Sequence, residues 1–260
     1  MAEKHRDYRT SAQAWAALEQ ELKLWKSAGD TPAFWWRDDD AVADTSQLQA
    51  LKAISEKENT PVFLAVIPAD LEASLAPALA NWPLAGVLQH GFDHHSHAAE
   101  GERKLELDPH RAPETIIESL NEGFTRLAAV FKESLYPVLV PPWNRYRPDL
   151  PVLLAQTPLK VLSGLDAREP AAVAMLNVHV DLLHLDKEES AELGEVRVLT
   201  SLIRHLAARR LGQSEASEPT GIMTHHLVMS PAHLSFLERL LHCLNCARVH
   251  WITDPVPAAR

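Results

Sequence analysis

The sequence predicts an α/β protein in which a parallel sheet, curled into a barrel or partial barrel, is covered by helices. Two observations favour this class. Short apolar segments alternate along the chain with amphipathic segments of helical period. There are about seven such strand–helix units, which suggests that the parallel sheet forms a barrel or partial barrel. A doubly wound sheet is the alternative, because it has the same alternation of elements.

The predicted strands are apolar runs bounded by polar or turn-forming residues. The first, at 33–36, is the aromatic run AFWW, which leads directly into three aspartates. The full set covers residues 33–36, 61–68, 85–90, 136–142, 159–166, 177–185, 221–229 and 248–254.

The predicted helices have apolar residues at three- and four-residue spacing. Residues 10–28 illustrate the pattern with Trp15, Leu18 and Leu22, and Gly29 is placed to end this helix. The set covers residues 10–28, 44–59, 71–82, 113–133, 195–212 and 231–246. We expect residues 1–260 to form one domain, with the first helix appended at its N-terminus.

Composition excludes several classes of protein. The chain has 260 residues, of which 46% are hydrophobic, and a net charge of −10 that disfavours nonspecific binding to nucleic acid. No apolar run reaches the roughly 18 residues of a membrane span, and residues 1–15 do not resemble a secretory signal, so a cytoplasmic protein is expected. Cys243 and Cys246 give no disulfide framework and are expected to pack in the core.

Polar residues follow four of the predicted strands. Asp38, Asp39 and Asp40 follow the first strand, and segments 90–97, 141–146 and 225–226 follow three others. Because active sites of parallel α/β folds form at the carboxyl ends of the strands, these segments are expected to meet.

The histidine-rich segment is a candidate metal site. His90 and His94 are four residues apart, and both can face one cation from a tight loop or a helical turn; His95 and His97 are alternatives. Two histidines and one carboxylate from the neighbouring aspartates would leave coordination positions free, which is typical of a catalytic ion.

The order of these segments resembles the NodB-type polysaccharide deacetylases of carbohydrate esterase family 4. The matching motifs are DDA at 39–41, HGFDH at 90–94, VPPWN at 140–144 and IMTH at 222–225, within residues 33–230. The resemblance implies a distorted (β/α)7-type barrel and a metal-dependent hydrolase that removes acetyl groups from N- or O-acetylated sugars.

Residue by residue, the resemblance implies that Asp40, His90 and His94 bind a divalent metal ion, expected to be zinc. It implies that Asp39 is the general base. Asp38 and Asp39 could instead take the roles of base and ligand, but the small Ala41 favours the later pair.

The resemblance also implies a general acid and an oxyanion donor. His225 corresponds to the acid, with His226 as the alternative, and Trp143 corresponds to the residue whose backbone N–H points at the oxyanion. Because side chains of a strand alternate between its two faces, only one of the two histidines can line the site.

Two motifs depart from the family. The third-motif arginine, which helps to set the base, is Val140 here; Arg37 or Arg145 could replace it. The nearest match to the fourth motif keeps Asp181 but has His184 and Leu185 in place of the expected pair.

Two other functions remain possible from the sequence. Some relatives of this fold hydrolyse cyclic amides, and a non-catalytic carbohydrate-binding protein could retain the barrel. All three hypotheses imply a small-molecule or carbohydrate partner.

Overall fold

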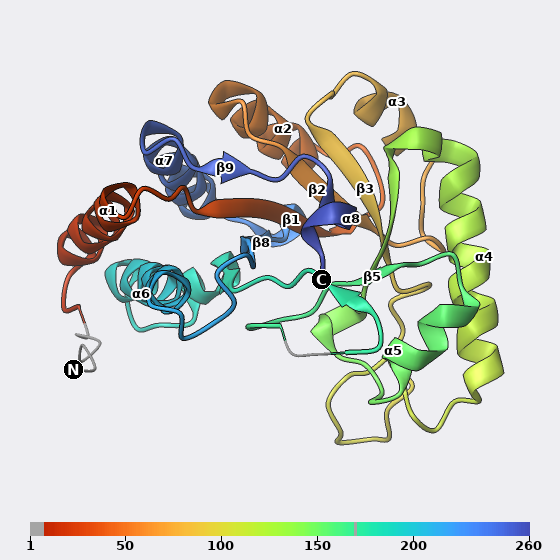
Figure 1. The fold of residues 1–260 in the computed structure, drawn as a ribbon. Coiled ribbons are helices and arrows are strands. Elements are labelled where there is room, and N and C mark those ends of the chain that lie inside the picture. The colour runs from red at the N-terminus through yellow and green to blue at the C-terminus, as the bar shows by residue number, and fades with distance from the viewer. Residues whose placement is uncertain (1–7, 169–170) are drawn as a thin grey trace.

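A computed structural model describes residues 8–168 and 171–260, and in it the central sheet is entirely parallel (Figure 1). The strand order is β6-β5-β4-β3-β2-β1-β8-β7, and β9 pairs with β1 beside the start of β2. An isolated parallel bridge joins Leu165, which follows β5, to Val178, which lies between β6 and β7. The segment from β6 to β7 thus pairs with β5 at its start and with β8 at its end, so the sheet curls into a distorted barrel. The predicted α/β class and distorted barrel are therefore confirmed.

The element bounds are as follows. The strands are β1 (Ala33–Ala41), β2 (Val62–Val66), β3 (Ala85–His90), β4 (Leu135–Val140), β5 (Val161–Leu162), β6 (Ala174–Met175), β7 (Val180–Asp181), β8 (Thr220–Thr224) and β9 (His250–Trp251). The α-helices are α1 (Ser11–Ser27), α2 (Ser46–Glu58), α3 (Leu75–Ala80), α4 (Pro113–Phe131), α5 (Leu150–Leu153), α6 (Ala191–Arg210), α7 (Pro231–Cys246) and α8 (Pro255–Ala258). The 3₁₀ helices are η1 (Lys132–Ser134), η2 (Pro142–Asn144), η3 (Leu154–Gln156), η4 (Leu182–Asp186) and η5 (His226–Val228).

Side chains of β1 alternate between the barrel interior and the helix layer, as the period of two requires. Trp35 packs inside with Phe63 and Met223, and its Nε1 donates to the carbonyl of Asn177 at 2.8 Å. Trp36 packs outside against the helices and is fully buried. This alternation fixes which residues after Trp36 can enter the interior.

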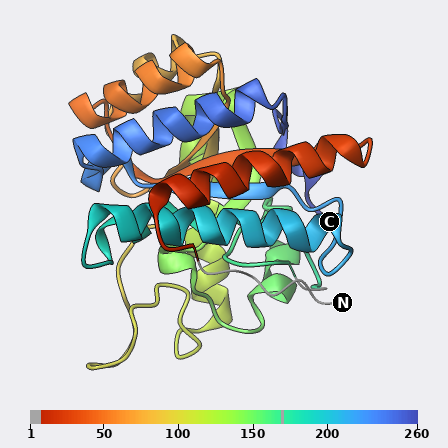
Figure 2. The same ribbon diagram turned by 90° about the vertical axis from the view of Figure 1, so that its left-hand side faces the viewer.

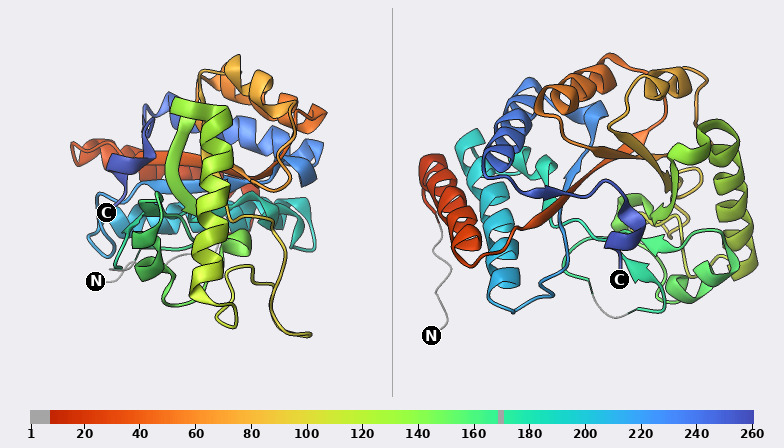
Figure 3. Two further views of the ribbon diagram at one scale, coloured as in Figure 1. Left: turned by 90° about the vertical axis from the view of Figure 1, so that its right-hand side faces the viewer. Right: turned by 45° about the horizontal axis from the view of Figure 1, so that its top comes forward.

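Helices cover the outside of the curled sheet. Helices α2, α7, α1 and α6 lie in a row along one side (Figure 2), while α4 covers the opposite side (Figure 3). The predicted N-terminal helix is present as α1, which begins after Thr10, whose side chain accepts from the N–H of Gln13. Within the described residues, no helix is both long and apolar enough to span a membrane.

Several predicted elements differ in extent from those observed. The helix expected at 71–82 is limited to α3, and the strand expected at 221–229 ends at Thr224, before η5. The strand expected at 177–185 is limited to β7, because Asp181 accepts from the N–H of Leu183 and starts the 3₁₀ turn η4. Helix α6 begins earlier than residue 195, because Ser190 caps it by accepting from the N–H of Leu193.

Candidate active site

The three consecutive aspartates after Trp36 have three different environments. Asp39 lies two residues after Arg37 on the inner face of β1, while Asp38 points to the outer layer. Asp40 has a positive φ of 69°, and the pairing of β1 with β2 is irregular between Asp38 and Ala41. This irregularity turns Asp40 away from the strand alternation and toward the loop after β3.

Arg37 holds Asp39 in a bidentate ion pair inside the barrel. Its Nε lies 2.8 Å from Oδ1 of Asp39 and its Nη2 lies 3.0 Å from Oδ2. The guanidinium also donates to Oγ of Ser163 at 2.7 Å and to Oδ1 of Asn144 at 2.5 Å. Both partners of the pair are almost completely buried, so the carboxylate is compensated by a cation rather than by water.

Arg145, the other candidate for this role, lies elsewhere. It donates to the carbonyl of Lys104 at 3.3 Å and is partly exposed. The cation that accompanies Asp39 therefore comes from β1 itself, and Val140 at the third motif is a fully buried apolar residue of the barrel interior.

Asp40, His90 and His94 converge on one point. Oδ1 of Asp40 lies 3.1 Å from Nε2 of His90 and 3.4 Å from Nε2 of His94, and all three ligand atoms are within 4.8 Å of one another. Ligands bound tetrahedrally to one zinc ion at about 2.0–2.2 Å would be about 3.3 Å apart. The spacing therefore fits a single cation between them.

The second nitrogen of His90 supports the same conclusion. Its Nδ1 lies 2.9 Å from the carbonyl oxygen of Val140, so Nδ1 carries a proton and donates it. In the neutral ring, the Nε2 lone pair then faces the carboxylate of Asp40. Two electron-rich atoms at that distance repel unless a proton or a cation lies between them. Burial would lower the pKa of His90, but a hydrogen bond to Asp40 and the nearby carboxylates raise it, so without a metal a second proton fills the position that a cation would take.

Asp40 is ionised at neutral pH, as a residue that binds a cation must be. Burial alone would raise the pKa of Asp40, but a hydrogen bond with His90 and the charges of three nearby imidazoles lower it to about 2. His225 is one of these three imidazoles. Asp40 is therefore an anion across the physiological pH range.

A buried carboxylate positions the loop that carries His94. Glu106 accepts from the N–H of Phe92 at 2.7 Å and from the N–H of His94 at 2.9 Å. His94 has a positive φ of 54°, a conformation that costs free energy in a non-glycine residue. Burial raises the pKa of Glu106 to about 7, although both backbone hydrogen bonds oppose that rise.

A second cluster of two histidines and a carboxylate, His179, His205 and Glu218, is not arranged to bind a metal ion. Nε2 of His179 lies 3.2 Å from Glu218, and Nε2 of His205 lies 3.7 Å from it. The N–H of Gly221 donates to Nδ1 of His179 at 2.9 Å, so in the neutral ring the proton is on Nε2. Nε2 of His179 thus has no lone pair for a metal, and this buried cluster is a structural network.

The two consecutive histidines after β8 point to different places. Asp38 accepts from the N–H of His226 at 3.0 Å and pairs with its Nδ1, and His226 is 1% exposed. His225 continues the inner-face alternation of Met223 and is partly exposed, and its buried Nδ1 has no hydrogen-bond partner among the described residues. Only His225 is thus directed toward the interior at the strand end.

Asp181 does not assist His225. Its Oδ1 accepts from the N–H of Leu183 at 2.8 Å, and its Oδ2 lies 4.0 Å from Nε2 of His184. The residue that matches the fourth motif in sequence therefore caps a 3₁₀ turn.

Trp143 lies beside His94, one of the three converging residues. Its ring centroid lies 4.4 Å from that of His94, and Nζ of Lys104 lies 5.7 Å from its ring. Its φ of 55° turns the backbone sharply, and the N–H groups of Asn144 and Arg145 donate to carbonyls of this turn. In the described part of the chain, no carbonyl accepts from the N–H of Trp143.

Known proteins match this chain in structure but not in sequence. No family model matches the sequence, and no curated protein matches it. A family 4 carbohydrate esterase from Streptomyces lividans, solved with acetate, matches the structure with a TM-score of 0.56. The match has 12% sequence identity and covers 88% of this chain and 96% of that chain.

The chain has the fold of the family 4 carbohydrate esterases.

Two further structures show the same fold. A family 4 acetyl xylan esterase from Clostridium thermocellum, solved with a cobalt ion, has a TM-score of 0.51 at 12% identity, covering 87% of this chain and 96% of that one. A family 4 pseudoenzyme from Bacillus anthracis has a TM-score of 0.54 at 11% identity, covering 87% and 65%. Because both an esterase and a pseudoenzyme have the family 4 fold, activity must be argued from the site itself.

Sequence analysis missed residues that position the site. Glu106 contacts the backbone of His94, and Asn144 and Ser163 contact the guanidinium of Arg37, yet the sequence assigned none of the three a role. Asn144 was adjacent to Trp143 in the third motif, which was the only available signal. The contacts of Glu106 depend on the path of a long segment, 91–112, that contains no helix or strand.

Proposed function

We propose that this chain is a metal-dependent hydrolase that removes an acetyl group from an N- or O-acetylated sugar. The observation that carries the proposal is the convergence of Asp40, His90 and His94 beside a buried carboxylate, Asp39, that is paired with Arg37. The fold supports it, since similar structures include a deacetylase solved with substrate and an esterase solved with acetate.

In this proposal Asp40, His90 and His94 hold one divalent cation. Two imidazoles and one carboxylate are a common ligand set for catalytic zinc and leave positions open for water and substrate. When bound there, such an ion would lower the pKa of a water molecule and polarise an acyl carbonyl.

Asp39 acts as the general base. Its negative charge favours protonation of both His90 and His94, so it lies within electrostatic reach of the cation site. Arg37 keeps the carboxylate oriented, and a carboxylate has lone pairs beyond the two that accept from the guanidinium. Asp39 can therefore take a proton from the attacking water as the bond to the acyl carbon forms.

His225 and Trp143 complete the arrangement. His225 donates a proton to the leaving nitrogen or oxygen. Its position supports this role, because it continues the inner face of β8 and is close enough for its charge to lower the pKa of Asp40. The N–H of Trp143 is available to donate to the developing oxyanion, a contact worth about 3 kcal/mol in other hydrolases.

The test measures metal content and acetate release together. Purified protein would be loaded with zinc or cobalt, quantified by elemental analysis and incubated with acetylated chito-oligosaccharides and acetylated xylan. One equivalent of metal and acetate release that is lost in Asp39→Asn would support the proposal.

The competing functions give different results in the same experiment. Ring opening of cyclic amides without acetate release would indicate a different bond specificity on the same fold. Stoichiometric metal, saturable sugar binding and no turnover on either panel would indicate a non-catalytic relative; a family 4 pseudoenzyme also has this fold.

A further inference from the structure

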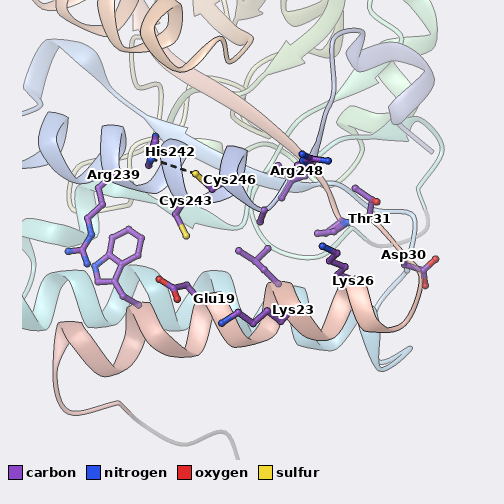
Figure 4. A pocket seen from close by; sticks show the side chains of 15 residues that line it. Glu19, Lys23, Lys26, Asp30, Thr31, Arg239, His242, Cys243, Cys246 and Arg248 are labelled. Atoms are coloured by element: carbon purple, nitrogen blue, oxygen red, sulfur yellow. Dashed lines mark hydrogen bonds between the residues drawn. The ribbon is translucent and has the colours of Figure 1, made fainter.

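A groove lined by two cysteines lies between α1 and α7. It has a volume of about 890 Å³ and is lined along α7 by Arg239, His242, Cys243 and Cys246 (Figure 4). The lining continues into residues 30–32, immediately before β1. The groove is therefore at the amino-terminal end of the strands, whereas the candidate active site is at their carboxyl ends.

The exposure of Cys246 contradicts the expectation that both cysteines pack in the core. Cys246 is exposed at the last residue of α7, and Cys243 is partly buried one turn earlier. The cause is the position of Cys246 at the helix end, where no further turn of α7 follows to cover it. An exposed thiol is available to react with small molecules.

Three side chains from two helices form a relay at this thiol. Sγ of Cys246 lies 3.5 Å from Nε2 of His242, and Nδ1 of His242 lies 3.3 Å from Oε2 of Glu58 on α2. A carboxylate can only accept, so Nδ1 of His242 carries the proton. The Nε2 lone pair then faces the thiol and can remove its proton.

The relay matters because a thiolate, not a thiol, is the sulfur nucleophile. A base within hydrogen-bonding distance of Cys246 can take its proton as the sulfur reacts. The side chain of His242 is 67% exposed, and its contact with the buried side chain of Glu58 is what orients the ring toward the thiol.

Cys243 is placed to react second. Burial raises the pKa of its thiol to about 11, so it remains protonated at neutral pH and is the poorer initial nucleophile. On an α-helix, residues three apart have Cα atoms about 5 Å apart. That separation lies within the roughly 4.4–6.8 Å found in disulfides. The Cβ atoms, about 5–6 Å apart on a helix, must approach to about 3.5–4.5 Å, so the last turn of α7 must open for the S–S bond to form.

We propose that Cys246 and Cys243 form a peroxide-sensitive dithiol in which Cys246 reacts first and His242 accepts its proton. The Cys246 thiolate attacks one oxygen of a hydroperoxide, the O–O bond breaks, and the leaving oxygen takes the proton held by His242. The sulfur of Cys243 then attacks the Cys246 sulfenic acid, forming the S–S bond and releasing water with the Cys243 proton. Two thiols are oxidised and one peroxide is reduced, independently of the proposed hydrolase function.

The test follows intact mass after addition of hydrogen peroxide to the full-length protein. Wild-type protein should lose two hydrogen atoms as a monomer, and peptide mapping should locate the disulfide at Cys243–Cys246. Cys243→Ser should stop at a sulfenic acid on Cys246 that dimedone traps. Cys246→Ser should react no faster than an ordinary thiol.

The role of the relay is tested by rate. His242→Gln should slow oxidation of Cys246 by about tenfold at pH 7, because glutamine cannot accept the proton of the thiol. His250→Gln, an exposed histidine near the same end of the molecule, should leave the rate unchanged. An intermolecular disulfide, preferential labelling of Cys243, or equal rates in wild type and His242→Gln would overturn the proposal.

Discussion

Arg37 and Asp39 lie two residues apart on one strand, face the same interior, and join through two hydrogen bonds of 2.8 and 3.0 Å. Removing the cation would leave a buried carboxylate uncompensated. We expect Arg37→Met to lower the free energy of unfolding by about 3–5 kcal/mol and to abolish turnover. Arg37→Met combined with Asp39→Asn should recover much of the stability but none of the activity.

Chemical denaturation and acetate release measure the two effects of the Arg37 substitution. Arg145→Met is the matched control, because Arg145 donates only to the carbonyl of Lys104 in the described structure. An Arg37→Met protein as stable as wild type would show that the ion pair is not formed in solution.

The proposed metal site is tested within residues 90–95, which span the end of β3 and the start of the following loop. His94→Ala and His90→Ala should each remove the bound ion, because two of the three converging ligand atoms would be left. His95→Ala should keep it, since His95 contacts Asp93 and its side chain is 75% exposed. Elemental analysis after dialysis distinguishes the variants, and full metal retention in both His90→Ala and His94→Ala would refute the assignment.

Substitutions of the three consecutive aspartates should have three different effects. Asp40→Asn should lose the metal, and Asp39→Asn should keep it but lose nearly all turnover. Asp38→Asn should keep the metal and lower stability by about 1–3 kcal/mol, because Asp38 accepts from Thr224 and His226 in the buried layer. Loss of metal in Asp39→Asn with retention in Asp40→Asn would shift the roles by one residue.

His225 and His226 should also have distinct effects. His225→Ala should retain metal and reduce kcat by about 10²- to 10⁴-fold, the usual contribution of a positioned acid. His226→Ala should act on stability, because His226 is buried against Asp38. If His226→Ala reduced kcat more than His225→Ala at equal stability, the acid would be His226.

The buried network around Glu218 predicts sensitivity to acid. Burial lowers the pKa of His179 to about 4, whereas an unfolded histidine titrates near 6.5. Between these values the unfolded chain binds more protons, so this contribution to stability is complete above about pH 6.5 and is lost as the pH falls toward 4. The loss should approach about 1.4 kcal/mol per pH unit in that window.

Urea denaturation from about pH 4.5 to 7.5 measures this slope. His179→Gln should flatten it relative to wild type, since glutamine does not titrate, while His95→Gln at an exposed position should not. Identical slopes for wild type and His179→Gln would contradict the predicted neutral histidine.

Local patterns predicted the framework of the site and left its internal contacts open. The alternation of side chains along a strand separated His225 from His226, and the order of motifs selected His90 and His94 from several histidines. Arg37 was one of two candidates, because a sequence does not show which arginine enters the barrel. Glu106 escaped prediction, since its contacts depend on how an irregular segment returns to the strand ends.

The contacts between Cys246, His242 and Glu58 could not be predicted from the sequence for the same reason. Cys243 and Cys246 share a helix, and their spacing is visible in the sequence. Glu58 comes from a different helix, and its contact with His242 depends on how α2 and α7 pack. The exposure of Cys246 depends on where α7 ends relative to its neighbours, which helical periodicity does not determine.

The position of Arg37 has a consequence for how such sequences diverge. When the cation that accompanies the proposed base comes from the same strand, Asp39 and Arg37 are inherited as one short segment. The end of β4 is then released from supplying an arginine, and Val140 can be selected for packing alone. Among homologues we expect compensating exchange: an arginine at position 37 or at position 140, rarely at both and rarely at neither. A motif definition that requires arginine at the later position would overlook chains built like this one.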